Sequence, residues 1–298
     1  MASTSTAPHS RVAHRLESLG DVSVASGRLS MVRRIAGDFS EKGLLVYASA
    51  LAFRILLALV PLALFGVALL GFLHLDEVWS ESVAPEIRDR VSAPAFTLID
   101  RTAEQVLTTK EGWWLTVGAA VALWEVSAGI RIAMRALDRI YEDHRPRSPV
   151  ARLIGSLALS VPISMLLLAA VAAAQILPPA LDRRGAGAVG DVLARALGWG
   201  LSAILVSVAI AVLVRFGSST ERPFHVAGVA SVVVVVCWTV ASTLFGLYAT
   251  HVASYGTLLG GLAFVFVLMV YVYISAVTFL AGLRAAAYAG NGSSASDL

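Results

Sequence analysis

The chain has 298 residues, of which 57% are hydrophobic and 14% are charged, and its mean hydropathy is +0.77. Soluble domains carry roughly a quarter charged residues, so this composition argues against a soluble protein and predicts a polytopic membrane protein whose partners are membrane lipids. The net charge of +3 is too small to indicate a nucleic-acid partner, and the one cysteine, Cys237, excludes an intrachain disulfide. We expect no cofactor.

The N-terminal region precedes the apolar part of the chain. Residues 1–27 are rich in Ser, Thr, Ala and His, and we expect a disordered cytoplasmic tail there. Apolar residues at helical spacing alternate with arginines over residues 28–42, which predicts an amphipathic helix. It would lie either on the bilayer surface or against the protein's own loops. The six-span domain is expected over residues 28–288, and residues 289–298 are expected to form a flexible cytoplasmic tail.

Six apolar segments follow, each near or above the roughly 20 residues that cross a bilayer as a helix. Because backbone polar groups must be satisfied inside lipid, the predicted fold is an all-α membrane bundle with six transmembrane helices. Pro61 and Pro162 interrupt the first and third segments, where we expect a kink or a local cavity. The segments are 44–73, 113–134, 151–177, 192–214, 224–247 and 258–283.

Arginine and lysine are unevenly distributed among the connections. The N-terminal region and the second connection hold most of them, whereas the third connection has Arg183 and Arg184 and the fifth has none. Positively charged loops remain in the cytoplasm, so both termini of this even-numbered bundle are expected there.

The first connection, residues 74–112, is long and acidic. Pro85 and Pro94 stand where helices could start, because proline is favoured in the first turn. An apolar stripe at near-helical spacing predicts one or two short amphipathic helices on the outer face. The stripe consists of Phe96, Leu98, Ile99, Ala103, Val106 and Leu107.

Two charged residues lie deep in predicted spans. Arg54 is about ten residues into the first span and Glu125 about nine residues from the cytoplasmic end of the second, so both lie roughly 13 to 15 Å in. A charge at mid-bilayer costs about 2.5 to 3.5 kcal/mol, so opposite charges at matched depth predict an ion pair in the bundle interior. Three interpretations stay open: a pair that only orients two helices, a part of a polar cavity or permeation path, and snorkelling of Arg54 to the interface.

Charged residues of both signs alternate where the second span leaves the membrane. Arg131 and Arg135 share a helix face, so they could hold the phosphate of a lipid head group, with Arg145 as a further contact. The alternative is a solvated face that only sets the orientation. No spacing in the chain matches a metal site, a phosphate-binding loop or a nucleophile elbow, so we predict neither metal ligands nor catalytic residues.

Three blocks of the sequence resemble the YihY/BrkB family. They read ASALAFRILLALVP in the first span, LWEVSAGIRIAMRALDRIYEDHRP in the second and SYGTLLGGLAFVFVLMVYVYISAVTFLAGLRAA in the last. The resemblance covers residues 30 to 288. It implies a six-span bacterial inner-membrane protein, in a family with links to serum resistance and to a suggested transport of envelope components. Arg54 and Glu125 stand where that family usually has an aromatic residue and a small or hydroxyl residue.

A further set of residues is expected either to line a cavity or to pack the helices. Tyr271 and Tyr273 carry hydroxyl groups inside the last span, where they would face a cavity or bond to a neighbouring helix. Gly256 begins a spacing of small residues that lets another helix approach. The set is Pro61, Ser127, Tyr255, Gly256, Tyr271 and Tyr273.

The predicted function is that of a transporter or flippase-like protein for envelope lipids or another amphiphile. The alternative is a non-transporting membrane scaffold in envelope assembly or serum resistance. A continuous polar cavity around Arg54 and Glu125 would favour transport, whereas a dry, closed bundle would favour the scaffold. The resembling family was once labelled ribonuclease BN, but the chain shows no residues arranged for phosphodiester hydrolysis, so an enzyme is not expected.

Overall fold

In a computed structural model the protein is helical throughout its regular elements, with no strand among the described residues. This confirms the all-α prediction. The chain divides into two units, Met1–Leu44 and Leu45–Leu298. The described residues are 37, 39, 41–74, 77, 79–88, 93–108, 113–143, 147–175, 177–178, 187–220, 222–252 and 261–294.

Only a few residues of the first unit are described. The predicted tail, 1–27, and most of the predicted amphipathic helix, 28–42, lie outside them. Gly43 adopts a φ of 65°, a left-handed conformation that glycine reaches without steric cost, and it directly precedes the first long helix.

The prediction of six spans is confirmed, because six helices in the described residues are long and apolar enough to cross a membrane. An α-helix satisfies its own backbone polar groups, as a hydrocarbon environment requires. Two of the helices continue through Pro61 and Pro162, and the last one continues to Ser294, into the predicted tail at 289–298. The six are α2 (Leu44–Phe72), α6 (Trp113–Ile140), α7 (Pro149–Gln175), α9 (Gly187–Gly217), α10 (Phe224–Val252) and α12 (Gly261–Ser294).

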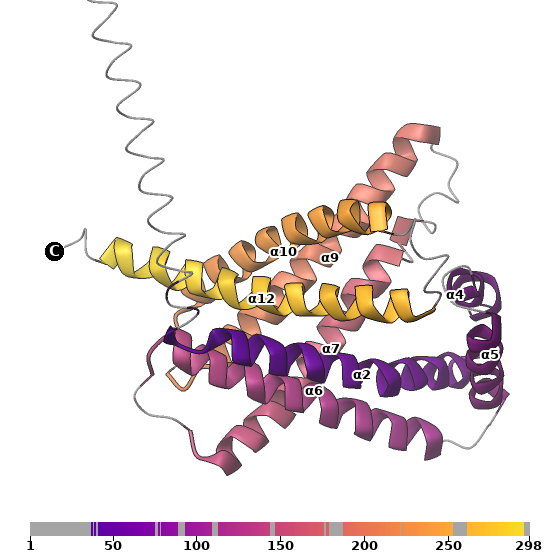
Figure 1. Cartoon of the computed structure of the whole chain (residues 1–298), viewed down its shortest axis with the longest axis horizontal. Coiled ribbons are helices and arrows are strands. Elements are labelled where there is room, and N and C mark those ends of the chain that lie inside the picture. The colour runs from indigo at the N-terminus through magenta and orange to yellow at the C-terminus, as the bar shows by residue number, and fades with distance from the viewer. Residues whose placement is uncertain are drawn as a thin grey trace, which may run out of the picture. The chain divides into compact units, whose positions relative to one another are not determined.

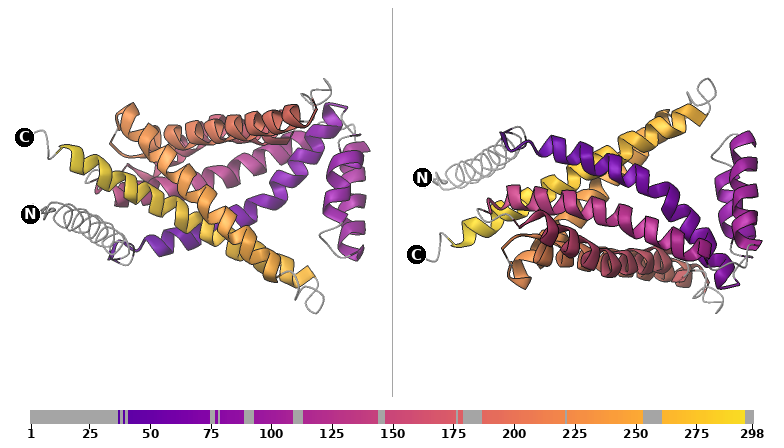
Figure 2. Two further views of the ribbon diagram at one scale, coloured as in Figure 1. Left: turned by 90° about the horizontal axis from the view of Figure 1, so that it is seen from above. Right: turned by 90° about the horizontal axis from the view of Figure 1, so that it is seen from below.

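The helices of the second unit pack in a continuous order. The right-hand view of Figure 2 shows α6 between α2 and α7, and from there α7 packs on α9, α9 on α10 and α10 on α12. On α6, Gly118 faces Phe65 of α2 and Gly129 faces Leu51 of the same helix. Because α6 also contacts α9 and α12, it is the helix through which the charged residues of the bundle are brought together.

Glycines allow two of these helix pairs to approach closely. A Cβ atom on Gly198 of α9 would lie 2.8 Å from the Ala173 carbonyl oxygen of α7. A Cβ atom on Gly282 of α12 would lie 2.9 Å from the Val234 Cα atom of α10. Only the hydrogen atom of glycine fits at such distances, and small residues at helix contacts are the usual means of tight association in lipid.

The most apolar window of helix α2 is less buried than that of any of the other five spans in the described residues. Only 6% of its most apolar window is buried, whereas 33% of the α6 window is. Large apolar side chains such as Phe53 and Val60 are exposed along it. Lipid tails are as apolar as these side chains, so their exposure is not unfavourable in a membrane. The polar contact of α2 with the bundle is its hydrogen bond to α6.

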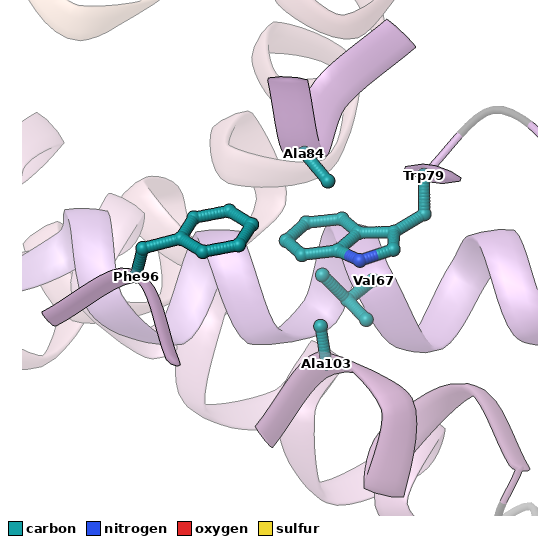
Figure 3. Close-up of a cluster of buried hydrophobic side chains, with 5 residues drawn as sticks. All are labelled: Val67, Trp79, Ala84, Phe96 and Ala103. Atoms are coloured by element: carbon teal, nitrogen blue, oxygen red, sulfur yellow. The ribbon is translucent and has the colours of Figure 1, made fainter. Parts of the chain in front are cut away.

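The first connection forms short helices in its described residues, as predicted. Figure 3 shows their apolar cluster, in which Trp79, Phe96 and Ala103 gather beside Val67 of α2. The Trp79 indole N–H donates to the Asp100 carboxylate at 3.2 Å. The last of these helices runs across the end of α2 (Figure 1 and Figure 2). The helices are η1 (Trp79–Val83), α4 (Ala84–Arg88) and α5 (Ala93–Thr108).

The predicted apolar stripe of α5 is right for one part and wrong for another. Phe96 and Ala103 are buried in the cluster and Leu107 packs against it. Leu98 is 69% exposed, however, and Ile99 is also exposed. At about 100° per residue Leu98 lies roughly 200° around the helix from Phe96, so both cannot face the same neighbour.

We expect Gly282→Ala to lower the melting temperature of the purified protein in detergent. The added Cβ atom would be forced against the Val234 backbone, and overpacking of this kind costs about 1–3 kcal/mol. Gly228→Ala on α10 is the matched control, since nothing lies within 4 Å of its Cβ position. Equal melting temperatures for the two variants would contradict the close contact of α10 with α12.

Candidate functional site

Arg54 of α2 and Glu125 of α6 form an ion pair. The Arg54 Nη1 group donates to Glu125 Oε2 at 3.2 Å. The two side chains are 39% and 19% exposed, so the pair lies at the edge of the α2–α6 contact and not in the closed bundle interior that the sequence predicted. The Arg54 head group points to Glu125, so snorkelling to the interface is not the arrangement observed.

Arg131 lies on α6 beyond Glu125 and is bonded to serine hydroxyls. Its Nη1 group donates to Ser127 Oγ at 2.7 Å and to Ser156 Oγ of α7 at 3.3 Å. The two serines are fully buried, with their hydroxyl oxygens 2.8 Å apart. Ser156 donates its one proton to the Leu153 carbonyl oxygen at 2.8 Å, so Ser127 is the donor within the serine pair.

The charges near the middle of α6 do not cancel. Arg131 is within electrostatic reach of Arg54, Glu125 and Arg135. Arg54 and Arg131 supply two positive charges and Glu125 supplies one negative charge, so one positive charge is left over, because serine hydroxyls are neutral. The Arg131 guanidinium also lies 5.4 Å from the centroid of the Trp124 ring, a cation–π contact that leaves the charge in place.

Of four further predicted site residues, only Arg135 on α6 is among the described residues. Arg135 is exposed and has no hydrogen-bond acceptor among the described residues. Arg145, Tyr255 and Gly256 lie outside the described residues, so their expected roles in head-group binding and packing stay predictions.

The remaining predicted residues lie away from the ion pair. The Tyr271 hydroxyl is 3.2 Å from Ser242 Oγ of α10, and its ring centroid is 5.2 Å from that of Phe245. Tyr271 therefore bonds to a neighbouring helix, which is one of the two expected arrangements. Tyr273 is exposed on α12, and Pro61 is half-buried within α2.

A second polar cluster, the end clasp, joins the end of α6 to the start of α7 and to the turn between α9 and α10. Asp138 of α6 accepts a hydrogen bond from Arg152 Nη2 at 3.2 Å and one from the Ser219 backbone N–H at 2.9 Å. Charge-assisted bonds of this kind hold three separate segments at fixed distances. The end clasp consists of Asp138, Tyr141, Asp143, Arg147, Arg152, Ser218, Ser219, Thr220 and Arg222.

Asp143 is the most enclosed acid of the end clasp, at 5% exposure of its side chain. It accepts a bond from Arg222 Nη2 at 2.7 Å and one from Ser218 Oγ at 2.9 Å. The Arg222 guanidinium also lies 4.5 Å from the centroid of the Tyr141 ring. Burial raises the pKa of the Tyr141 phenol, and the positive charge of Arg222 opposes that rise.

Arg147 closes the other side of the end clasp. It donates to the carbonyl oxygens of Phe216 and Ser218 at 3.0 and 2.9 Å, where the last carbonyl groups of α9 lack helical partners. Helix α7 then begins at Pro149, and the Ala151 N–H donates to Ser148 Oγ at 3.2 Å. Serine as the cap and proline at the first position are favoured choices for a helix start.

Arg284 ties α12 to the same end of α6. This buried side chain donates through Nη1 to the Ile140 carbonyl oxygen at 2.6 Å, and its Nη2 lies 3.8 Å from Glu142 Oε1. The guanidinium also lies 4.4 Å from the centroid of the Tyr288 ring. The terminal carbonyl group of α6 thereby gains a cationic partner, and a positive charge is stabilising at the C-terminal end of a helix, where the helix dipole is negative.

Sequence reasoning missed the end clasp as a structure. It used the arginines of the connections only to predict orientation and did not single out Ser218–Thr220. The available signal was a group of three acids, Asp138, Glu142 and Asp143, in a connection otherwise rich in arginine. Within the described part of the chain, no group of three or more His, Cys, Asp or Glu side chains could hold a metal ion.

These features define a class: a polytopic helical membrane protein that carries charged and hydroxyl side chains within its spans. The model of the family described as "Virulence factor BrkB" matches residues 35–297, so the chain belongs to that family, and the resemblance seen in the sequence is confirmed. The ribonuclease-like protein YfkH of Bacillus subtilis (strain 168) is 26% identical over 239 residues, which make up 79% of this chain and 86% of the relative. No solved structure matches the chain.

We expect Arg54→Leu and Glu125→Leu each to lower the melting temperature in detergent, and the double variant to recover most of the loss. Removing one partner leaves an uncompensated charge, whereas removing both leaves none. Breaking a fully buried ion pair costs about 3–5 kcal/mol of stability. Because Arg54 is partly exposed, we expect each single variant to lose less than that. A double-mutant cycle measures the coupling, and strictly additive losses would show that the two side chains do not interact.

Proposed function

We propose that this protein is a membrane transporter or flippase-like protein that moves the polar head of an amphiphile past the Arg54–Glu125 pair. The observation that carries the proposal is the position of these charges inside two spans, at an edge that the protein does not close. Ionisable side chains inside a membrane protein are costly and are found mainly where they pair with one another or line a pathway. Arg131, held by neutral serines, adds a positive charge that the Glu125 carboxylate does not neutralise.

The helix packing supports movement of α2 against α6. Only 6% of the most apolar window of α2 is buried, and the polar link of α2 to α6 is the ion pair at 3.2 Å. A substrate head group that carries both charge and hydrogen-bonding groups can take the place of either partner, so the pair would open without leaving a bare charge in lipid. The end clasp holds α6, α7 and α9 together during such a movement.

A non-transporting scaffold in envelope assembly is the second candidate. It is favoured by the end clasp, because charge-assisted bonds that hold loops and helix ends together are what a rigid platform for other proteins would have. In that reading the Arg54–Glu125 pair only fixes the angle between two helices.

The first test concerns orientation, since we also propose that the arginine-rich end of the bundle faces the cytoplasm of a bacterial cell. Arginine-rich connections remain on the cytoplasmic side, and the end clasp holds Arg147, Arg152 and Arg222. A reporter fused after Leu298 should therefore read cytoplasmic, and one inserted near Pro85 should read external. The opposite pair of readings would overturn the orientation.

The second test is movement of a fluorescent lipid in vesicles that contain the purified protein. An impermeant reductant added outside quenches an inner-leaflet label only after that lipid has moved to the outer leaflet. We expect this slow part of the quenching to be faster than in empty vesicles. Arg54→Leu combined with Glu125→Leu should slow it by about tenfold or more, the change that about 1.4 kcal/mol in the barrier gives. This double variant is chosen because it is expected to keep its stability.

Arg101→Gln is the matched control for the transport assay. Arg101 is exposed on α5, outside the spans, so this variant removes one charge without touching the pair. Equal rates for the native protein, the control and the double variant would contradict a role of the pair in movement. Rates no faster than in empty vesicles would favour the scaffold.

A further inference from the structure

One face of α6 changes from apolar to cationic along its length. Val117, Val121 and Trp124 are exposed in the first half, at spacings of four and three residues. Arg131 and Arg135 follow at the spacing that continues the same face, since positions three and four residues apart lie above one another on a helix. The face therefore has the polarity of an amphiphile, with an apolar part and a charged part.

The cationic part of this face has few anionic partners. Arg131 donates only to the Ser127 and Ser156 hydroxyls, through one of its terminal nitrogens, among the described residues. Arg135 and Arg139 are exposed and have no acceptor in the described part of the chain. Each arginine can donate five N–H groups, so most of this donor capacity is unused.

The positive charges near Arg131 outnumber the negative ones, which favours the binding of an anion beside it. The two guanidinium groups of Arg54 and Arg131 face one carboxylate, that of Glu125. At about 1.5 Å per residue Arg131 lies roughly 14 Å from Ile140, the end of α6, and Arg135 lies about half as far. A cation so far inside a span is costly unless a counter-charge reaches it.

We propose that Arg131 and Arg135 bind the phosphate of an anionic lipid whose tail lies along Val117, Val121 and Trp124. This proposal deepens the proposed function. Lipid binding at this site does not depend on transport, and only the statement that the bound lipid is a transport substrate rests on the proposed function. Arginine suits a phosphate because its planar donor group forms two parallel N–H···O bonds. The two arginines are one helical turn apart, so one phosphate can contact both.

The occupant is a lipid and not a free anion because of what surrounds the arginines. The face continues into exposed apolar side chains, with Trp124 at 51% exposure beside the Arg131 guanidinium. An inorganic phosphate would gain the charge contacts but leave that apolar surface unpaired. A lipid gains both, and because Arg131 bonds to the buried serines through Nη1 alone, its other guanidinium N–H groups can donate to the head group.

The experiment measures lipid binding to the full-length protein in detergent, by native mass spectrometry and by the melting temperature. Phosphatidylglycerol should bind and raise the melting temperature, whereas phosphatidylcholine and inorganic phosphate should have much smaller effects. Arg135→Gln and Arg131→Gln should each weaken phosphatidylglycerol binding about fivefold, the change that about 1 kcal/mol per arginine gives. Arg101→Gln, which removes an exposed charge from α5, should bind as the native protein does.

Arg135→Gln is the decisive variant because Arg135 has no described partner whose loss would unfold the protein. Unchanged phosphatidylglycerol binding in that variant would overturn the proposal, as would equal binding of phosphatidylcholine to the native protein. A phosphate effect as large as the phosphatidylglycerol effect would overturn the lipid as the occupant. If the fluorescent lipid does not move in vesicles but Arg135→Gln still loses phosphatidylglycerol binding, the lipid site stands and the transport function fails.

Discussion

The cost of placing a charge in hydrocarbon is the constraint on which this structure depends. Helix α6 carries Glu125 and Arg131 within its span, and each needs a partner from another helix. Glu125 obtains one from Arg54 of α2, and Arg131 obtains hydroxyl groups from its own helix and from Ser156 of α7. Helices α2, α6 and α7 are therefore joined by polar contacts within their spans, while glycines and small apolar residues shape the rest of the packing.

The two ends of α6 are treated differently by the fold. At one end, Asp138, Asp143 and the Ile140 carbonyl group bond to arginines and to the turn between α9 and α10, so that end is fixed. Between Gly118 and Gly129, α6 meets α2, whose most apolar window is only 6% buried. A bundle that is clamped at one end and loosely covered along one side can open along that side without losing its overall connectivity, which is what passage of a head group would require.

Features that depend on residues close together in the sequence could be predicted, whereas contacts between distant segments could not. The six spans depend on local hydropathy, and the approach of Arg54 to Glu125 depends on helical rise alone, so both could be predicted. In the end clasp, Asp138 and Asp143 bond to residues of the turn between α9 and α10 that are 75 to 81 positions away in sequence, and nothing local indicates which turn meets which acid. The exposed position of the pair was missed because the pattern of one helix does not show that its neighbours leave one side open.

Two kinds of arginine can be distinguished by their acceptors. Arg152 and Arg222 bond to carboxylates in the end clasp, where opposite charges cancel and the guanidinium groups serve to hold segments together. Arg131 is held as firmly, at 2.7 Å from Ser127 Oγ, but by hydroxyl groups that fix its direction without reducing its charge. The serines hold one terminal nitrogen of Arg131 and leave its charge uncompensated, which fits the proposal that this side chain binds an anionic group.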